Sequence, residues 1–84
     1  MRHFASPAFW KLYEKLPSVV QELADKNFEL LKADPKHPSL HLKKAGGYWS
    51  ARVGMRYRVL GTEIDEGMLW FWIGTHADYD KMLD

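Results

Sequence analysis

The sequence predicts an α+β fold in which an N-terminal helical hairpin packs on an antiparallel sheet of three to four strands, with a short helix at the C-terminus. Two observations give this prediction. Apolar residues recur at the helical spacing of three to four before Pro35, and they alternate with polar residues after it. The chain has 84 residues, the size of one small domain, so we expect residues 1–84 to share a single core.

Two helices are expected in the N-terminal part of the chain. In the stretch FASPAFWKLYEKLP, Ser6 can cap a helix that begins at Pro7, where the missing N–H of proline does no harm. Pro17 disfavours helical geometry at the residue before it, so the chain must turn there. A second helix then runs until Asp34 and Pro35, and its apolar stripe comprises Val20, Leu23, Ala24, Phe28 and Leu31. Because the connection is so short, we expect the two helices to pack as an antiparallel hairpin.

The pattern becomes that of strands after the loop DPKHPS. Leu40 and Leu42 alternate with polar residues, AGG supplies a turn, and the strands YWSARV, RYRVL and MLWFWIG follow. The last of these is apolar throughout, as expected of an inner strand or one covered on both faces, so Trp70 and Trp72 are assigned to the core. Thr75 can cap a short final helix. One side of that helix carries His76, Tyr79 and Leu83.

Three arginines lie within seven positions of the stretch YWSARVGMRYRVLG. If residues 54–56 form the loop between the two strands, Arg52 lies directly opposite Arg58. This register sends Trp49, Ala51, Val53, Tyr57 and Val59 towards the helices, and Tyr48, Ser50, Arg52 and Arg58 away from them. A two-residue loop would instead mix Arg58 into the core face. Like charges facing each other across strands cost a few tenths to ~1 kcal/mol, which a fold tolerates more readily if an anion binds there.

Charge is unevenly distributed along the chain, although the net charge is only +1. Residues 36–61 contain six lysines and arginines and no carboxylate, whereas residues 62–84 contain one lysine and six carboxylates. Such segregation indicates a polyanionic partner, and a solvated basic face neutralised by the acidic C-terminal part explains the charge equally well. The sequence has no cysteine, and its histidines show no metal-ligand spacing. We therefore expect no metal or cofactor, no membrane segment and a cytoplasmic location.

The paired arginines suit the chemistry of RNA cleavage. Two guanidinium groups fixed by a sheet can bind a phosphodiester and stabilise the charge that builds in its transition state. Cleavage also requires one group to take the 2′-OH proton and another to protonate the leaving 5′ oxygen. His76 is the best-placed candidate near neutral pH, and Tyr79 can stack on a base or assist the proton transfers. A capping histidine and a core tyrosine are the commoner roles for such residues.

The order of elements and the phrases HPSLHLKK, YWSARVGMRYRVL and WFWIGTHADYDKML resemble the RelE/ParE superfamily of bacterial type II toxin–antitoxin toxins over nearly the whole chain. The resemblance implies a RelE-like fold and a cognate antitoxin that neutralises the protein. Most RelE-type members are ribosome-dependent endoribonucleases that cut messenger RNA by 2′-OH attack without a metal, whereas ParE-type members inhibit DNA gyrase. By this resemblance, Arg58 matches the strand arginine that contacts the scissile phosphate. Arg52 matches the basic position on the preceding strand. His76 and Tyr79 match the basic and aromatic positions that follow the last strand.

The leading hypothesis is therefore a toxin that cleaves messenger RNA on the ribosome and inhibits translation. Catalysis is assigned to Arg58, His76, Arg52 and Tyr79, and RNA or phosphate binding to Lys43, Lys44, Arg56 and Tyr48. Some RelE members carry a lysine pair where Tyr48 and Ser50 stand, which favours the alternative of a non-enzymatic gyrase inhibitor or an inactive relative that binds only its antitoxin. A nucleic-acid-binding module unrelated to toxins is a third hypothesis. The expected partners are an antitoxin that covers residues 36–61, and the ribosome with its messenger RNA or else DNA gyrase.

Overall fold

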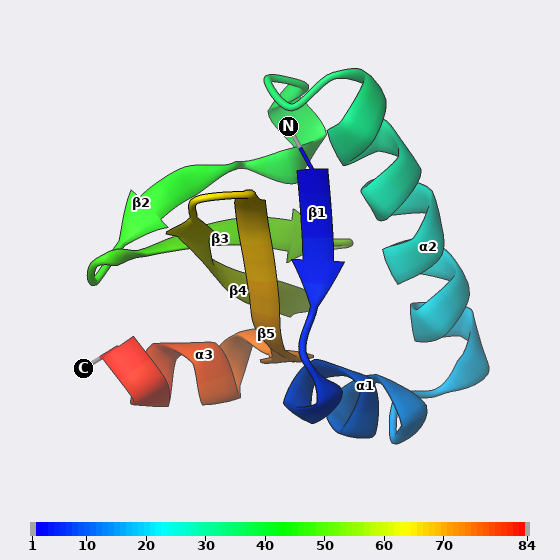
Figure 1. Ribbon diagram of the computed structural model, residues 1–84. Helices are drawn as coiled ribbons and strands as arrows, with labels where there is room; N and C mark the ends of the chain where they lie inside the picture. Colours follow the sequence, from blue (N-terminus) through cyan, green and yellow to red (C-terminus); the bar gives the residue numbers. More distant parts are fainter. Residues whose placement is uncertain (1, 84) are drawn as a thin grey trace.

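The structure is a computed structural model that describes residues 2–83. In this part of the chain it is an α+β fold with five strands, three α-helices and one 3-10 helix. The elements are β1 (Arg2–Ala5), α1 (Pro7–Glu14), α2 (Ser18–Ala33), η1 (Pro38–Leu40), β2 (Lys43–Ala45), β3 (Tyr48–Val53), β4 (Tyr57–Ile64), β5 (Gly67–Thr75) and α3 (His76–Leu83). Figure 1 shows their arrangement around the sheet. Within residues 2–83, no helix is long and apolar enough to span a membrane.

The sheet has the strand order β1-β5-β4-β3-β2. Strands β2 to β5 form the predicted antiparallel meander, and β5 is an inner strand, as its apolar sequence indicates. The described sheet has one strand more than expected, because β1 pairs in parallel with β5. The segment around Leu40 also differs from the prediction. It forms the 3-10 helix η1 after Pro38, and β2 is confined to Lys43–Ala45.

Helix α1 begins as predicted, because Ser6 Oγ accepts a hydrogen bond of 3.2 Å from the Phe9 N–H and Pro7 occupies the first turn. Helices α1 and α2 follow each other through the short turn at residues 15–17, and the pair packs on the sheet as expected of the N-terminal helices. Helix α1 packs on β5 and α2 on β3 (Figure 1). Of the apolar stripe expected on α2, Val20 and Leu31 are buried, whereas Leu23 and Phe28 are exposed. Near the turn the two helices are linked by the Tyr13 hydroxyl, which donates to Asp25 at 2.8 Å.

The turns set the register of the arginine strands. Gly46 and Gly47 have φ values of +59° and +86°, the left-handed conformation that a two-residue hairpin turn requires. The loop between β3 and β4 consists of residues 54–56, and Val53 pairs with Tyr57. The odd loop inferred from the hydrophobic pattern is therefore confirmed.

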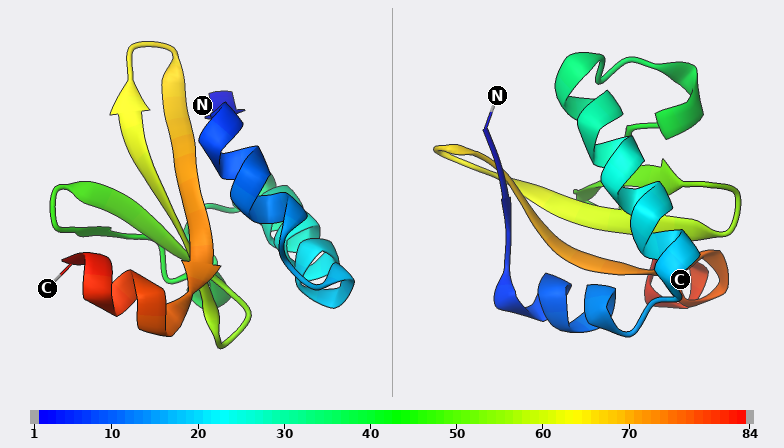
Figure 2. Two further views of the ribbon diagram at one scale, coloured as in Figure 1. Left: turned by 90° about the horizontal axis from the view of Figure 1, so that it is seen from below. Right: turned by 90° about the vertical axis from the view of Figure 1, so that its right-hand side faces the viewer.

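The sheet is covered on both faces. Helices α1 and α2 lie on one face and α3 on the other (Figure 2, left). The first face carries the main core cluster, which comprises Leu31, Leu40, Ala51, Met68 and Trp70, with Trp49 and Val59 packed against it. The second face was expected to be open around the arginines. Instead, α3 places Tyr79 on it, and Ser50, Arg58 and Leu60 are buried there. Trp70 is confirmed as a core residue, whereas Trp72 is only half-buried.

Candidate functional site

The two strand arginines lie directly opposite each other, one residue pair away from the end of the β3–β4 hairpin. Arg52 on β3 pairs with Arg58 on β4, as the sequence predicts. They line a surface depression between the hairpin loop and the start of α3, which we call the arginine hollow. Its lining residues are Arg52, Met55, Arg56, Tyr57, Arg58, Thr75, His76 and Ala77. The fold thus brings together four of the predicted site residues: Arg52, Arg56, Arg58 and His76.

Arg58 is a buried cation with an unused hydrogen-bond donor. Its residue is only 7% exposed, and its guanidinium carbon lies 5.7 Å from the centre of the Tyr79 ring. The buried Nη1 atom has no hydrogen-bond partner among residues 2–83. Burial, and then the like charge of Arg52, lower the pKa of Arg58 below its ordinary value. Because an unpaired buried donor and a facing like charge are both unfavourable, an anion in the hollow would relieve both.

Tyr79 supports Arg58 from below. The residue is 6% exposed, and its hydroxyl donates a hydrogen bond of 3.2 Å to Ser50 Oγ in the buried layer between α3 and the sheet. This burial corresponds to the core position that is the commoner role for such a tyrosine. The sequence places Tyr79 on the same side of α3 as His76, but it does not show that this side packs against the sheet.

Arg52 contacts a histidine that the sequence did not single out as a site residue. One guanidinium nitrogen of Arg52, Nη2, lies 3.5 Å from His41 Nδ1, and its Nε is buried without a hydrogen-bond partner in the described chain. On the backbone, the Arg52 carbonyl accepts a bond of 3.0 Å from the Asn27 side chain on α2. In the sequence, His41 lies two residues before β2, the strand that pairs with the Arg52 strand β3. This position is the feature that could have pointed to it.

His76 stands at the edge of the hollow. It is the first residue of α3, and its backbone N–H donates a bond of 2.7 Å to the Arg56 carbonyl, which fixes the start of the helix against the hairpin loop. Its side chain is 45% exposed, and Nδ1 lies 3.2 Å from Asp80 Oδ2. Thr75 caps the helix as predicted, because its hydroxyl accepts the Asp78 N–H at 3.1 Å. Asp80 therefore leaves the other ring nitrogen, Nε2, free for a substrate.

Strand alternation separates the remaining candidates. Lys43 pairs with Ser50 and therefore shares the face of the arginines. Lys44 pairs with Trp49 and lies on the other face, where its Nζ is 4.0 Å from a Glu63 carboxylate oxygen. Tyr48 is exposed but begins β3, at the far end from the hollow. Of the predicted RNA-binding residues, Arg56 lines the hollow, Lys43 and Tyr48 share the face of the arginines at a distance from it, and Lys44 lies on the other face.

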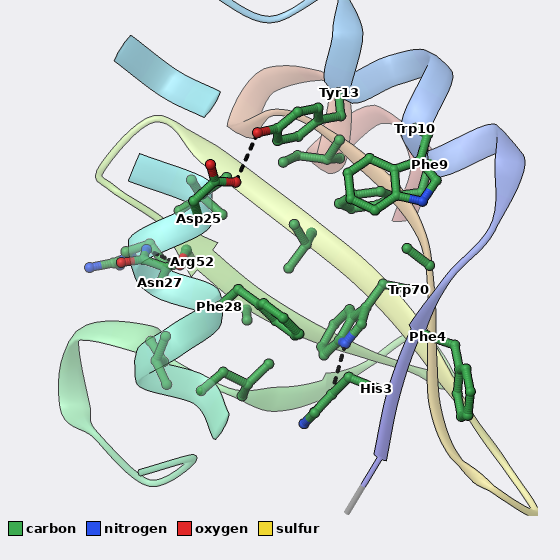
Figure 3. A pocket seen from close by; sticks show the side chains of 18 residues that line it. His3, Phe4, Phe9, Trp10, Tyr13, Asp25, Asn27, Phe28, Arg52 and Trp70 are labelled. Atoms are coloured by element: carbon green, nitrogen blue, oxygen red, sulfur yellow. Dashed lines mark hydrogen bonds between the residues drawn. The ribbon is translucent and has the colours of Figure 1, made fainter. Parts of the chain in front are cut away.

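A second cavity lies between α1, α2 and the sheet (Figure 3) and has a volume of about 300 Å³. Its lining is mostly apolar. Several of the polar side chains that Figure 3 labels are hydrogen-bonded to each other. Tyr13 donates to Asp25, which raises the pKa of the phenol, and Trp70 Nε1 donates to His3 Nδ1 at 3.1 Å. Burial lowers the pKa of His3. This cavity offers no pair of free cations, so the arginine hollow is the candidate site for an anion.

The described residues contain no group of three histidine, aspartate or glutamate side chains arranged to hold a metal ion.

Comparisons with known proteins agree on one family. A family model described as a ParE-like toxin domain matches residues 18–81. The fold is similar to a chain of the crystal structure of the RelB-RelE antitoxin-toxin complex from Methanococcus jannaschii, with a TM-score of 0.73 and 14% identity over 96% of this chain and 99% of that chain. It is also similar to the isolated E. coli RelE toxin, with a TM-score of 0.63 and 17% identity over 95% of this chain and 93% of that one. A search of curated proteins found no match.

Proposed function

This chain belongs to the family of ParE-like toxin domains and is a toxin of the RelE/ParE superfamily, and from this premise we propose that it is a ribosome-dependent endoribonuclease that cleaves messenger RNA without a metal. One observation carries the proposal. Arg58 is buried opposite Arg52, its Nη1 has no hydrogen-bond partner within residues 2–83, and the exposed side chain of His76 lines the same hollow. An inhibitor that only covered its target would not require a buried, unpaired guanidinium group.

The scissile phosphate binds between the two arginines. Each guanidinium group has a buried nitrogen without a partner in the described chain, Nη1 of Arg58 and Nε of Arg52, and both lie on residues that line the hollow. A phosphate accepts such donors in a forked geometry. The facing strands hold both arginine side chains next to the hollow, so their positive charge is in place where charge builds in the transition state. Loss of one preorganised donor of this type typically costs ~2.7–4 kcal/mol in the transition state.

His76 supplies a proton-transfer group. The 2′-OH gives its proton to a base as its oxygen attacks phosphorus, the bond to the 5′ oxygen breaks, and the leaving oxygen takes a proton from Nε2 of the imidazolium form of His76. Asp80 faces Nδ1 at 3.2 Å and orients the ring for this transfer. The products are a 2′,3′-cyclic phosphate and a 5′-hydroxyl end. Tyr79 serves by holding Arg58 in place under the phosphate.

The RNA chain extends over the basic surface next to the hollow. We assign this binding to Arg56, which lines the hollow, and to Lys43, which shares the face of the arginines. Lys44 provides a matched control, because its Nζ contacts Glu63 on the other face. Lys43→Ala should weaken RNA binding and lower the slope of log affinity against log salt by about one, whereas Lys44→Ala should change neither.

The cognate antitoxin is the second partner, and it covers residues 36–61. Two observations support this proposal. That segment carries six basic residues and no carboxylate, and one solved structure of the same fold is named as an antitoxin–toxin complex. Neutralisation follows if the antitoxin places carboxylates on Arg52 and Arg58. Because the target is the translating ribosome, the site of action is the cytoplasm.

Controlled expression in a bacterial host tests the activity. Messenger RNA ends are mapped minutes after induction, while the DNA-damage response is followed in the same culture. We expect cuts at fixed codon phases, and loss of these cuts in His76→Ala and Arg58→Ala. Lys44→Ala is the control and should cut as the wild type does. DNA damage with intact messenger RNA, together with inhibition of purified gyrase, would instead assign the toxin to the gyrase-inhibiting type.

A further inference from the structure

RNA cleavage at the arginine hollow needs two proton transfers, and this inference rests on the proposed function. His76 accounts for one transfer. Tyr79, the other group expected to assist, is buried and donates its hydroxyl to Ser50. The lining of the hollow contains arginines, one histidine and uncharged residues, so it has no carboxylate that could supply the second group. The lining offers only the Tyr57 phenol for the second transfer, and an imidazole next to the arginines would be better matched to proton transfer near neutral pH.

His41 fulfils this condition. It is exposed, and its Nδ1 lies 3.5 Å from Nη2 of Arg52. The residue ends η1 in the left-handed conformation, with φ of +46°, and it is the one non-glycine residue with positive φ in the described chain. Residues held in this conformation occur more often at functional sites than elsewhere. The turn brings the imidazole to Arg52 across eleven positions of sequence.

The contact also defines which nitrogen is available. A guanidinium group has only donors, so the Nδ1 atom that faces it presents a lone pair. Arg52 covers this lone pair while the hollow is empty. When a phosphate binds, Arg52 donates to the phosphate oxygens instead, and Nδ1 is released next to the bound nucleotide.

We propose that His41 is the general base of the cleavage reaction. His41 Nδ1 takes the proton from the 2′-OH as the 2′ oxygen forms its bond to phosphorus. The bond from phosphorus to the 5′ oxygen breaks, and that oxygen receives a proton from the imidazolium form of His76. The reaction leaves His41 protonated and His76 neutral, and hydrolysis of the cyclic phosphate is not required. The two histidines thus act from the two flanks of the arginine pair.

The test compares His41→Asn and His41→Gly with His37→Asn in a purified ribosome assay on a defined messenger RNA. Asparagine and glycine both accept the positive φ at position 41, so the turn is retained. His37 caps η1, where its ring accepts the Ser39 N–H, and asparagine can replace it in that role. We expect the His41 variants to lower kcat by about 10²–10⁴-fold with unchanged thermal unfolding, and the His37 variant to cut at the wild-type rate.

Added imidazole separates a chemical role from a structural one. Imidazole should restore part of the kcat of His41→Gly, because it can occupy the vacated space and accept the 2′-OH proton. Wild-type rates in both His41 variants would overturn the inference and leave the nuclease function intact. A slow His41→Gly that imidazole does not accelerate would also overturn the assignment as base. Failure of the wild type itself to cut messenger RNA would overturn the proposed function and this inference together.

Discussion

Replacement of Tyr79 by phenylalanine tests whether this residue positions Arg58 or transfers protons. The substitution removes only the hydroxyl, which donates a buried bond of 3.2 Å to Ser50 Oγ, and it keeps the ring 5.7 Å below the Arg58 guanidinium. Loss of the bond leaves the Ser50 hydroxyl, which is 1% exposed, without its donor. The expected destabilisation is about 1–2 kcal/mol, and each 1 kcal/mol lowers the Tm of a domain of this size by about 4–8 °C.

Thermal unfolding of the wild type, Tyr79→Phe, Ser50→Ala and the double variant measures the coupling energy between the side chains of Tyr79 and Ser50. The double variant should be little less stable than either single variant, because both remove the same bond. In the ribosome assay, Tyr79→Phe should cut messenger RNA at nearly the wild-type rate, whereas Tyr79→Leu, which lacks the ring beneath Arg58, should cut more slowly. A folded Tyr79→Phe variant that loses cleavage 100-fold or more would refute the positioning role and make the phenol a proton-transfer group.

Substitutions at three further positions test the fold. Burial lowers the pKa of His3 from its ordinary value of 6.5, so the unfolded chain binds the proton more readily. The stability of the wild type should therefore fall as pH drops through about 6.5. Denaturant unfolding at several pH values should show this loss, and His3→Gln should show less of it. Equal slopes of unfolding free energy against pH in the two proteins would contradict the assignment of the loss to His3. Gly61→Ala should destabilise by about 1–3 kcal/mol, because the new Cβ would lie 2.6 Å from the buried Trp70 ring; a wild-type Tm would contradict this contact. Ser6→Ala removes the cap that accepts the Phe9 N–H and should cost about 1 kcal/mol in denaturant unfolding, whereas Ser6→Asn should retain most of the stability.

Local chemistry made much of the fold predictable from sequence. Ser6 and Pro7 specify the start of α1 through their own backbone preferences. The hydrophobic alternation on either side of residues 54–56 specifies the register that places Arg52 opposite Arg58. These features depend on neighbours in sequence, so periodicity and turn residues are sufficient to find them.

The features that sequence did not predict depend on long-range contacts. Strand β1 is four residues long and pairs with β5 at the other end of the chain, so it shows no useful periodicity. The burial of Tyr79 depends on which face of the sheet α3 covers, and the contact of His41 with Arg52 depends on the turn that ends η1.

The cutting of a defined messenger RNA on purified ribosomes by the wild type and by Arg58→Ala tests the central claim most directly. Arg58 is the buried cation of the hollow, and its loss removes a donor to the phosphate. The wild type should produce fragments with 5′-hydroxyl ends, and Arg58→Ala should produce them at least 100-fold more slowly while it remains folded by circular dichroism. Equal cutting by the two proteins would show that the arginine hollow is not the site of cleavage.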